Sequence, residues 1–492
     1  MKISIRSVNR DALVRAAVYA LLFLFAAHAF CFFNLTYSTQ SVMINASKGT
    51  TSQIGGGQYL LTFYWRLRGA IAAPLWVGLL SAVYLTLSVW AVAWLLRLER
   101  PLSLFMLCGA MTVNAAVIAL FAGSLHTADA ALLAVLLSVL AAACCVRLRW
   151  GWLPGAVLMA GAMGLDPVGP ACGVSLAVIA LCRELIDGQA GRRTGARAFG
   201  VLLSVAAGAA MCLVGYRMML ARYGLEMEAS LQPAAGGSLL GAWLYPLKQM
   251  LEPLTAYPHA NIVLRALLFL TGLIALVLCI RRMTRLRGLF LCVAALVLPL
   301  LVNLPVFARE GMGQTSLAFC FLDVFLVMLV DACAGNERLV CAVRRITAAA
   351  LGVLFVGSII FANQVYLKKN LEFQSTLSVM TRVLDRAEQV EGYQPGATPV
   401  ALVGTLEDST LSVPHVGFEH LAALDAASGN YAMASEQDNT WYMWEILGYP
   451  CNFVSSFELS QIEEMQAVQD MPAFPAAGCC QMVEGTLVIK LS

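Results

Sequence analysis

Two arginines and two aromatic residues end a long polar segment near the start of the chain. The segment covers residues 35–69 and finishes with Tyr64, Trp65, Arg66 and Arg68. It also holds three consecutive glycines and several amide and hydroxyl side chains, yet it contains no Asp or Glu. Guanidinium groups bind phosphate, and aromatic rings offer an apolar face with a polar edge. These residues predict contact with a polar ligand at a membrane surface, although Arg66 and Arg68 could equally anchor a helix at the headgroups.

The elements that must position these residues are membrane-spanning helices. The chain has 492 residues, of which 60% are hydrophobic and only 12% charged, with a mean hydropathy of +0.76. Soluble domains have about 25% charged residues. Apolar stretches recur along the chain, and each is long enough to cross a hydrocarbon core of about 30 Å as a helix. The composition therefore predicts a polytopic α-helical membrane protein in a lipid bilayer, with no cofactor and no nucleic-acid partner.

We expect about eleven spans. They cover residues 12–34, 70–96, 101–122, 127–146, 151–165, 168–186, 198–221, 260–280, 288–308, 315–333 and 346–365. The first could be misread as a cleaved secretion signal, but its uninterrupted apolar run favours a retained helix. The segment GLDPVG at 164–169 predicts a tight turn, or a re-entrant pair, between spans five and six. Within residues 222–259, the stretch GAWLYPLKQMLEPL predicts an interfacial amphipathic helix with Trp243 and Tyr245 at headgroup level.

The distribution of basic residues sets the orientation. If the N-terminus lies inside, 19 of the 32 Lys and Arg residues fall on successive inner segments. This alternation is what the positive-inside rule requires of short cytoplasmic loops. It predicts a multi-pass protein of the cytoplasmic membrane with its C-terminus outside.

The composition changes after about residue 365. Residues 366–492 contain 16 of the 29 acidic residues but only five Lys and Arg. This division predicts a membrane domain at 1–365 and an acidic extracytoplasmic domain at 366–492. A helical pattern begins the second domain, and residues 398–406 and 485–492 are typical of strands, so we expect a small α/β module. Its three cysteines, Cys451, Cys479 and Cys480, allow a disulfide in an oxidising compartment. No Cys or His spacing predicts a metal site.

Ionisable residues near the predicted outer ends of the spans are the candidates for chemistry, because a charge is rarely kept in a membrane helix without a role. Asp129 begins span four, and Asp166 lies in the turn before Pro167. Arg309 occupies a short outer loop, and Asp323 lies within span ten. Asp129 and Asp166 are our catalytic candidates. The alternatives stay open that Asp129 caps or flanks its helix and that Asp166 only forms the turn.

Several stretches resemble the bacterial membrane glucosyltransferases that modify O-antigen and related surface polymers. The similar stretches include FNLTYSTQSVMI, GGGQYLLTFYWRLRGAIAAPLWVGLLS, ANQVYLKKNLEFQSTLSVMTRVLDRAEQVEGYQPGATPVALVG and MPAFPAAGCCQMVEGTLVIKLS. The resemblance covers nearly the whole chain. It implies a C-type glycosyltransferase of a bacterial inner membrane, which moves a sugar from a polyprenyl-phosphate donor to a surface polysaccharide on the outer face. It also implies possible partners in a flippase and a donor-synthesising enzyme.

The resemblance assigns substrate binding to Gln40, Gln58, Tyr64, Trp65, Arg66, Arg68 and Arg309. Two of these positions depart from the family pattern. Relatives usually carry an acidic residue near the position of Gln40, and an arginine where this chain has Gln58. Glutamine can bind a sugar, but it can neither accept a proton as a base nor neutralise a phosphate. Either the base has moved, with Asp129 as the best candidate, or the protein binds lipid-linked glycan without turnover. A transporter or flippase of lipid-linked sugar is a third hypothesis.

Overall fold

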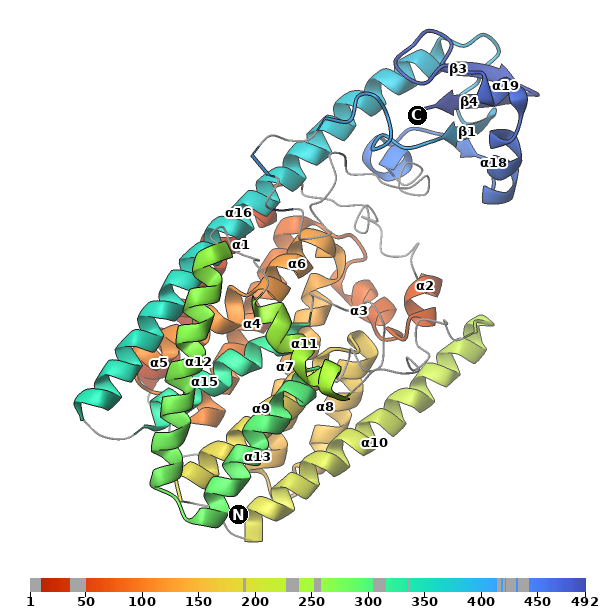
Figure 1. Ribbon diagram of the computed structural model, residues 1–492. Helices are drawn as coiled ribbons and strands as arrows, with labels where there is room; N and C mark the ends of the chain where they lie inside the picture. The colour runs from red at the N-terminus through yellow and green to blue at the C-terminus, as the bar shows by residue number, and fades with distance from the viewer. Residues whose placement is uncertain are drawn as a thin grey trace.

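The computed structural model describes most of the chain (Figure 1). The described residues are 10–35, 50–188, 192–226, 239–251, 258–303, 316–333, 337–413, 417, 418, 421, 431 and 442–492. Two predicted binding residues, Gln40 and Arg309, lie outside this part of the chain. Its architecture is a bundle of long helices with a small sheet at one end, reached by a single very long helix (Figure 1).

Nine helices in the described part of the chain are long and apolar enough to cross a membrane. They are α1 (Arg10–Phe33), α4 (Pro74–Leu96), the pair α5 (Pro101–Thr112) and α6 (Ala115–Gly123), α7 (Leu125–Arg147), α9 (Gly169–Ile186), α10 (Arg192–Tyr223), α12 (Pro258–Arg281), α13 (Arg285–Val302) and α16 (Arg338–Glu388). The remaining two predicted spans correspond to shorter helices. These are α8 (Trp152–Leu165) and α15 (Cys320–Ala332), the latter preceded by the 3₁₀ turn η3 (Leu317–Phe319). The prediction of a polytopic helical protein is confirmed.

Local sequence explains where several helices begin and end. Pro74 and Pro101 occupy first-turn positions of α4 and α5, where a missing N–H costs nothing. Asn114 separates α5 from α6, because its side chain accepts a hydrogen bond from the Val117 N–H and caps the second helix. Asp166 ends α8, and its Oδ1 accepts the Val168 N–H at 2.8 Å. The tight turn predicted at 164–169 is therefore present.

α16 runs from Arg338 to Glu388 without a break, so residues 365 and 366 lie inside one helix. Its 51 residues give a length of about 75 Å at the α-helical rise. The first half packs against α1 and α12, and the second half reaches the sheet. Near the middle, the Tyr366 hydroxyl bonds His28 Nδ1 of α1 at 2.7 Å. The helix thus joins the bundle to the C-terminal sheet (Figure 1).

The sheet has four strands in the order β2-β1-β4-β3. They are β1 (Pro399–Val403), β2 (Asn452–Phe453), β3 (Cys480–Val483) and β4 (Thr486–Lys490). β1 lies parallel to both of its neighbours, whereas β3 and β4 form an antiparallel pair. β1 and β4 correspond to the two strands expected from the sequence. One face of β1 packs on α16, and the other packs near α18 (Ser456–Glu463) and α19 (Gln466–Gln469), with the short π-helix η6 (Tyr442–Ile446) beside α16.

The disulfide that the sequence allows among Cys451, Cys479 and Cys480 is not formed. All fifteen cysteines of the chain lie in the described part and are free thiols. Cys451 is buried beside the Met443 sulfur at 3.8 Å. The neighbours Cys479 and Cys480 have their sulfurs 3.8 Å apart, a contact distance rather than a bond. These thiols act as small hydrophobic groups in the core beside the sheet.

α11 (Leu239–Leu251) covers residues 241–251 of the segment predicted as an interfacial helix, and the last three residues of that segment lie outside the described part of the chain. Its Trp243 donates from Nε1 to the Leu296 carbonyl of α13 at 2.7 Å. The Tyr245 ring meets the Phe319 ring edge to face, with centroids 6.3 Å apart. Both aromatic residues therefore contact neighbouring helices, and their depth in a bilayer stays a prediction.

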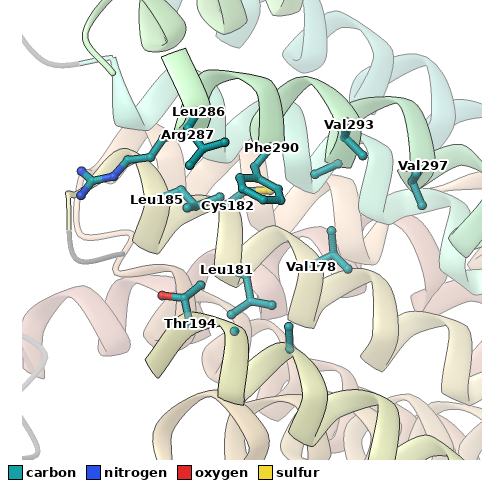
Figure 2. Close-up of a pocket in the computed structure, with 13 residues that line it drawn as sticks. Val178, Leu181, Cys182, Leu185, Thr194, Leu286, Arg287, Phe290, Val293 and Val297 are labelled. Atoms are coloured by element: carbon teal, nitrogen blue, oxygen red, sulfur yellow. The ribbon is translucent and has the colours of Figure 1, made fainter. Parts of the chain in front are cut away.

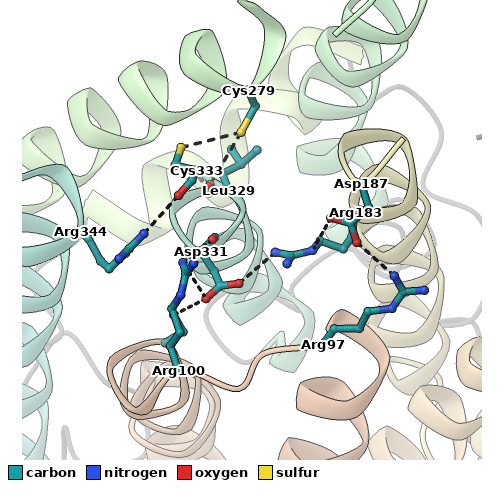
Figure 3. A network of polar contacts seen from close by, with 10 residues as sticks. Arg97, Arg100, Arg183, Asp187, Cys279, Leu329, Asp331, Cys333 and Arg344 are labelled. Atoms are coloured by element: carbon teal, nitrogen blue, oxygen red, sulfur yellow. Dashed lines mark hydrogen bonds and ion pairs between the residues drawn. The ribbon is translucent and has the colours of Figure 1, made fainter. Parts of the chain in front are cut away.

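The arginines predicted to face the cytoplasm gather at one end of the bundle, which we call the arginine-rich end (Figure 3). Asp331, at the end of α15, is the centre of this network. Its Oδ2 accepts from Arg183 of α9 at 3.0 Å, and its Oδ1 accepts from Ser103 of α5 at 2.7 Å. Arg100 donates to the Asp331 carbonyl at 2.8 Å. One buried carboxylate therefore joins α5, α9 and α15.

We expect Asp331→Ala to lower the free energy of unfolding by about 3 kcal/mol, because it removes the buried carboxylate that Arg183 and Ser103 share and leaves Arg183 only the more exposed Asp187. Glu337→Ala is the control, since Glu337 is 69% exposed and 3.9 Å from Arg282. The control should change stability by less than about 1 kcal/mol. Thermal unfolding in nanodiscs, followed with a dye that reacts with buried cysteines, measures both. Equal effects of the two substitutions would contradict the role given to Asp331.

Candidate functional site

The polar segment singled out in the sequence folds into two short helices, α2 (Thr50–Gly55) and α3 (Leu61–Arg68), within its described part. The Leu60 N–H donates to the Gly164 carbonyl at the end of α8 and fixes the start of α3. Gly69 ends the helix with φ at +111°, a conformation that other residues rarely adopt, and its N–H bonds the Trp65 carbonyl. The turn returns the chain to α4, which starts at Pro74.

The two faces of α3 differ sharply. Leu61, Tyr64 and Trp65 are buried, and they pack against Ala130 of α7 and Leu165 of α8 within one apolar cluster. The helical period puts Arg68 on the same face, four residues after Tyr64. A second set of side chains on α3 is exposed, namely Phe63, Arg66 and Leu67. The two arginines therefore have different surroundings, and only Arg68 faces the bundle.

Arg68 forms a buried ion pair with Asp129. The guanidinium Nη1 lies 2.5 Å from Asp129 Oδ1, and both side chains are fully buried. The same nitrogen donates to the His126 carbonyl at 3.1 Å. Tyr64 donates its hydroxyl to Asp129 Oδ2 at 2.8 Å, and the Ala130 N–H bonds Oδ1 at 3.0 Å. We call Tyr64, Trp65, Arg68, His126 and Asp129 the Asp129 cluster.

Burial, and then the neighbouring Asp129 carboxylate, raise the pKa of Tyr64 far above its usual range. The hydroxyl therefore stays protonated and keeps donating to Asp129. It also lies 3.4 Å from the Tyr84 hydroxyl of α4. The Asp129 carboxylate thus links α3 to α7, and Tyr84 of α4 joins them through the Tyr64 hydroxyl. Asp129 is the fifth residue of α7 and not its cap. The capping interpretation of Asp129 is therefore wrong.

Several donors of the Asp129 cluster are buried without a hydrogen-bond partner among the described residues. They are Arg68 Nε and Nη2 and Trp65 Nε1, and His126 Nδ1 is also unpaired. Each buried polar group left unpaired costs about 1–3 kcal/mol, so such groups usually mark a site that a polar ligand or water completes. The Trp65 and His126 rings lie together, with centroids 6.1 Å apart. The arrangement suits a phosphate or a sugar hydroxyl better than an apolar ligand.

The other predicted site residues lie outside this cluster. Asp166 follows Leu165 of the apolar cluster, but its Oδ1 is used in the turn described above, which matches the structural interpretation. Gln58 is half-buried just before α3, where its N–H bonds the Gln53 carbonyl and its own carbonyl accepts from Leu61. Arg66 is exposed.

Sequence reasoning missed other charged and polar residues at this end. His126 was overlooked, although it stands three residues before Asp129 on the same helix face. Arg265 lies inside a predicted span, which was a usable signal, and its Nη1 bonds both carboxylate oxygens of Asp323 at 2.8 and 2.9 Å. On α16, the buried Glu372 lies 3.1 Å from Lys369 and 3.7 Å from Lys368. Because this ion cluster lies where the composition of the chain changes, its charged residues did not stand out in the sequence.

We expect Asp129→Ala to destabilise the protein by about 3–5 kcal/mol, because it strands the Arg68 charge in a buried site. Adding Arg68→Met should recover part of that loss, since the double variant leaves no unpaired ion. Arg66→Met is the matched control and should be neutral, because Arg66 is exposed on the same helix. Thermal unfolding and protease protection of residues 50–69 provide the measurements. Strictly additive effects of the two substitutions would argue against the pair.

No family model, no curated protein and no solved structure matches the chain. The resemblance of the sequence and the chemistry of the Asp129 cluster are therefore what point to a function.

Proposed function

We propose that the protein is a membrane glycosyltransferase that moves a sugar, glucose by the resemblance, from a polyprenyl-phosphate carrier to a cell-surface glycan. The multi-pass helical bundle supports a substrate that stays in the lipid bilayer. The orientation expected from the arginines places α3 and the Asp129 cluster on the outer face of a bacterial inner membrane, together with the C-terminal sheet. A surface-polysaccharide acceptor would be reached from that face.

The observation that carries the proposal is the pairing of a buried acid with an arginine that has unused donors. Arg68 Nη1 donates to Asp129 and to the His126 carbonyl, whereas Arg68 Nε and Nη2 have no hydrogen-bond partner among the described residues. A guanidinium edge with two free N–H groups fits two oxygens of a phosphate. Trp65 adds an indole donor and a ring face, which suit a sugar.

The chemistry needs one proton acceptor and one stabiliser of the leaving group. The acceptor hydroxyl oxygen attacks the anomeric carbon, and the bond from that carbon to the phosphate oxygen breaks with its electron pair. Polyprenyl phosphate leaves, its charge neutralised by Arg68. Asp129 takes the hydroxyl proton as general base. A phosphate that draws Arg68 to itself weakens the Arg68–Asp129 pair, so donor binding prepares the carboxylate for this role.

A second candidate function is binding of lipid-linked glycan without turnover. The specific observation in its favour is that Asp129 has no exposed surface and already accepts from Arg68, Tyr64 and the Ala130 N–H. A carboxylate held by these three donors has a structural role in this arrangement. Gln58, where the resemblance expects arginine, points in the same direction.

Purified protein in vesicles with polyprenyl-phosphate glucose and acceptor glycan tests the main proposal. We expect Asp129→Asn to lower transfer about 10²–10⁴-fold through loss of the base, and Arg68→Gln about 10²-fold through loss of phosphate stabilisation. Arg149→Gln should stay near wild type, because Arg149 is exposed just beyond the other end of α7. Full activity of folded Asp129→Asn protein would overturn the assignment. Flux of donor across sealed vesicles without transfer would support a transporter.

The binding-only alternative predicts a different pattern. Wild-type protein should retain polyprenyl-phosphate glucose but give no transfer, whereas the combined Gln40→Asp and Gln58→Arg variant should gain transfer, because it restores a base and a phosphate-binding charge. Gln53→Arg is a control for adding charge nearby. Transfer by the wild-type protein at a rate that the double variant does not raise would exclude this alternative.

A further inference from the structure

An apolar groove of about 520 Å³ lies between α9, α10 and α13, away from the Asp129 cluster. Leu181 and Leu185 of α9 form its floor, and Ala198 of α10 lines one wall. Phe290 and Val293 of α13 line the other wall (Figure 2). All three helices are long and apolar enough to cross a membrane. The groove therefore opens to the bilayer, and its occupant has to present hydrocarbon.

The groove follows from how the helices pack. α10 packs mainly against α8, while α13 packs mainly against α9, and the groove lies between α10 and α13. The side chains that α10 contributes to the groove are small, since its lining residues include Gly195 and Ala198. The side chains that α13 contributes are larger and project into the groove, with Phe290 56% exposed and Val293 47% exposed. A groove with small residues on one side and large apolar residues on the other offers an extended hydrocarbon chain apolar contacts along its length.

One end of the groove is cationic. Arg287 lies at that end, with Val297 at the other (Figure 2). Among the described residues Arg287 has no ion pair, in contrast to Arg183 of α9, which pairs with both Asp187 and Asp331. None of the thirteen described residues that line the groove is acidic. The complementary ligand is a long apolar chain with a negative head.

The cationic end belongs to the arginine-rich end of the bundle. The Arg287 guanidinium approaches Gly188, the residue after Asp187 of the network in Figure 3. Asp129 lies at the other end of α7, about 27 Å from Arg147 by the helical rise. Arg147 itself donates to the Leu95 carbonyl at the arginine-rich end. A phosphate at Arg287 therefore sits in the opposite leaflet from one at the Asp129 cluster.

We propose that this groove binds one anionic phospholipid of the leaflet at the arginine-rich end. The lipid phosphate lies on Arg287, and an acyl chain follows Phe290 and Val293 toward Val297. Basic pockets between membrane helices on the cytoplasmic side are known to hold anionic headgroups. The site is independent of the proposed transferase chemistry, because it lies at the far end of the bundle.

Native mass spectrometry from nanodiscs of phosphatidylglycerol and phosphatidylcholine, in equal amounts with matched chains, tests the site. Wild-type protein should release with one phosphatidylglycerol bound in preference to phosphatidylcholine. Arg287→Gln should lower that occupancy about fivefold, the effect of one headgroup charge. Arg285→Gln, an exposed charge on the same helix outside the groove, should leave it unchanged. Equal binding by Arg287→Gln and wild type, or no preference between the two lipids, would overturn the proposal.

A second variant tests the groove itself. Ala198→Phe fills the trough and should remove the retained phosphatidylglycerol, whereas Leu202→Phe, exposed on α10 outside the groove, should not. Thermal unfolding of each variant shows that the fold is kept. A parallel preparation with added polyprenyl phosphate distinguishes the lipid source. Displacement of phosphatidylglycerol by polyprenyl phosphate in the wild type, or retention of phosphatidylglycerol by folded Ala198→Phe, would refute the assignment.

Discussion

Charged side chains in a hydrocarbon medium have to be paired, and this constraint decides how the helices of the bundle meet. Apolar helix surfaces gain little by meeting each other instead of lipid, so apolar contacts alone specify few neighbours. Buried carboxylates supply the missing specificity at both ends. Asp331 joins α5, α9 and α15 at the arginine-rich end, and Asp129 joins α3 and α7 at the opposite end.

The two carboxylates differ in what they leave unsatisfied. Around Asp331, two arginines and a serine donate to one residue, and Arg183 Nε, which makes no hydrogen bond among the described residues, lies 3.3 Å from a second carboxylate, that of Asp187. Around Asp129, Arg68 and Trp65 retain buried donors without partners in the described part of the chain. A network whose unused donor lies beside a carboxylate only holds helices together, whereas one whose donors have no partner can also receive a ligand. The same pair that fastens α3 to the bundle is therefore the one with capacity for chemistry.

Charge also separates the two ligand-binding regions that we propose. The Asp129 cluster offers donors next to an acid, which suits a phosphate that must later depart. The groove ending at Arg287 offers a lone cation above an apolar trough, which suits a lipid that stays. Asp129 lies near the start of α7, whereas the groove is lined by the last part of α9 and by Arg287 at the arginine-rich end. The two regions therefore share no residue.

Local patterns predicted much of this molecule. Apolar runs predicted the helical membrane protein, Asp166 and Pro167 predicted the turn after α8, and the β-rich stretches near 398–406 and 485–492 predicted β1 and β4. Local pattern was not enough elsewhere. The acidic tail predicted a second domain from residue 366, and α16 continues through that position, because helical periodicity does not change where a helix leaves the apolar region. The sequence left a disulfide among Cys451, Cys479 and Cys480 open, since composition cannot place two sulfurs within bonding distance, and the structure has these cysteines as free thiols.

By itself, the sequence determined the class of the protein and where most of its apolar helices lie along the chain, because length and hydropathy act locally. The tertiary structure alone decided which charges meet. Arg68 and Asp129 are 61 residues apart, and Arg265 and Asp323 are 58 apart. No spacing rule connects such positions, since a neighbour across helices depends on packing and not on separation along the chain. The polar segment could therefore be recognised from its residues, but its pairing with Asp129 could not.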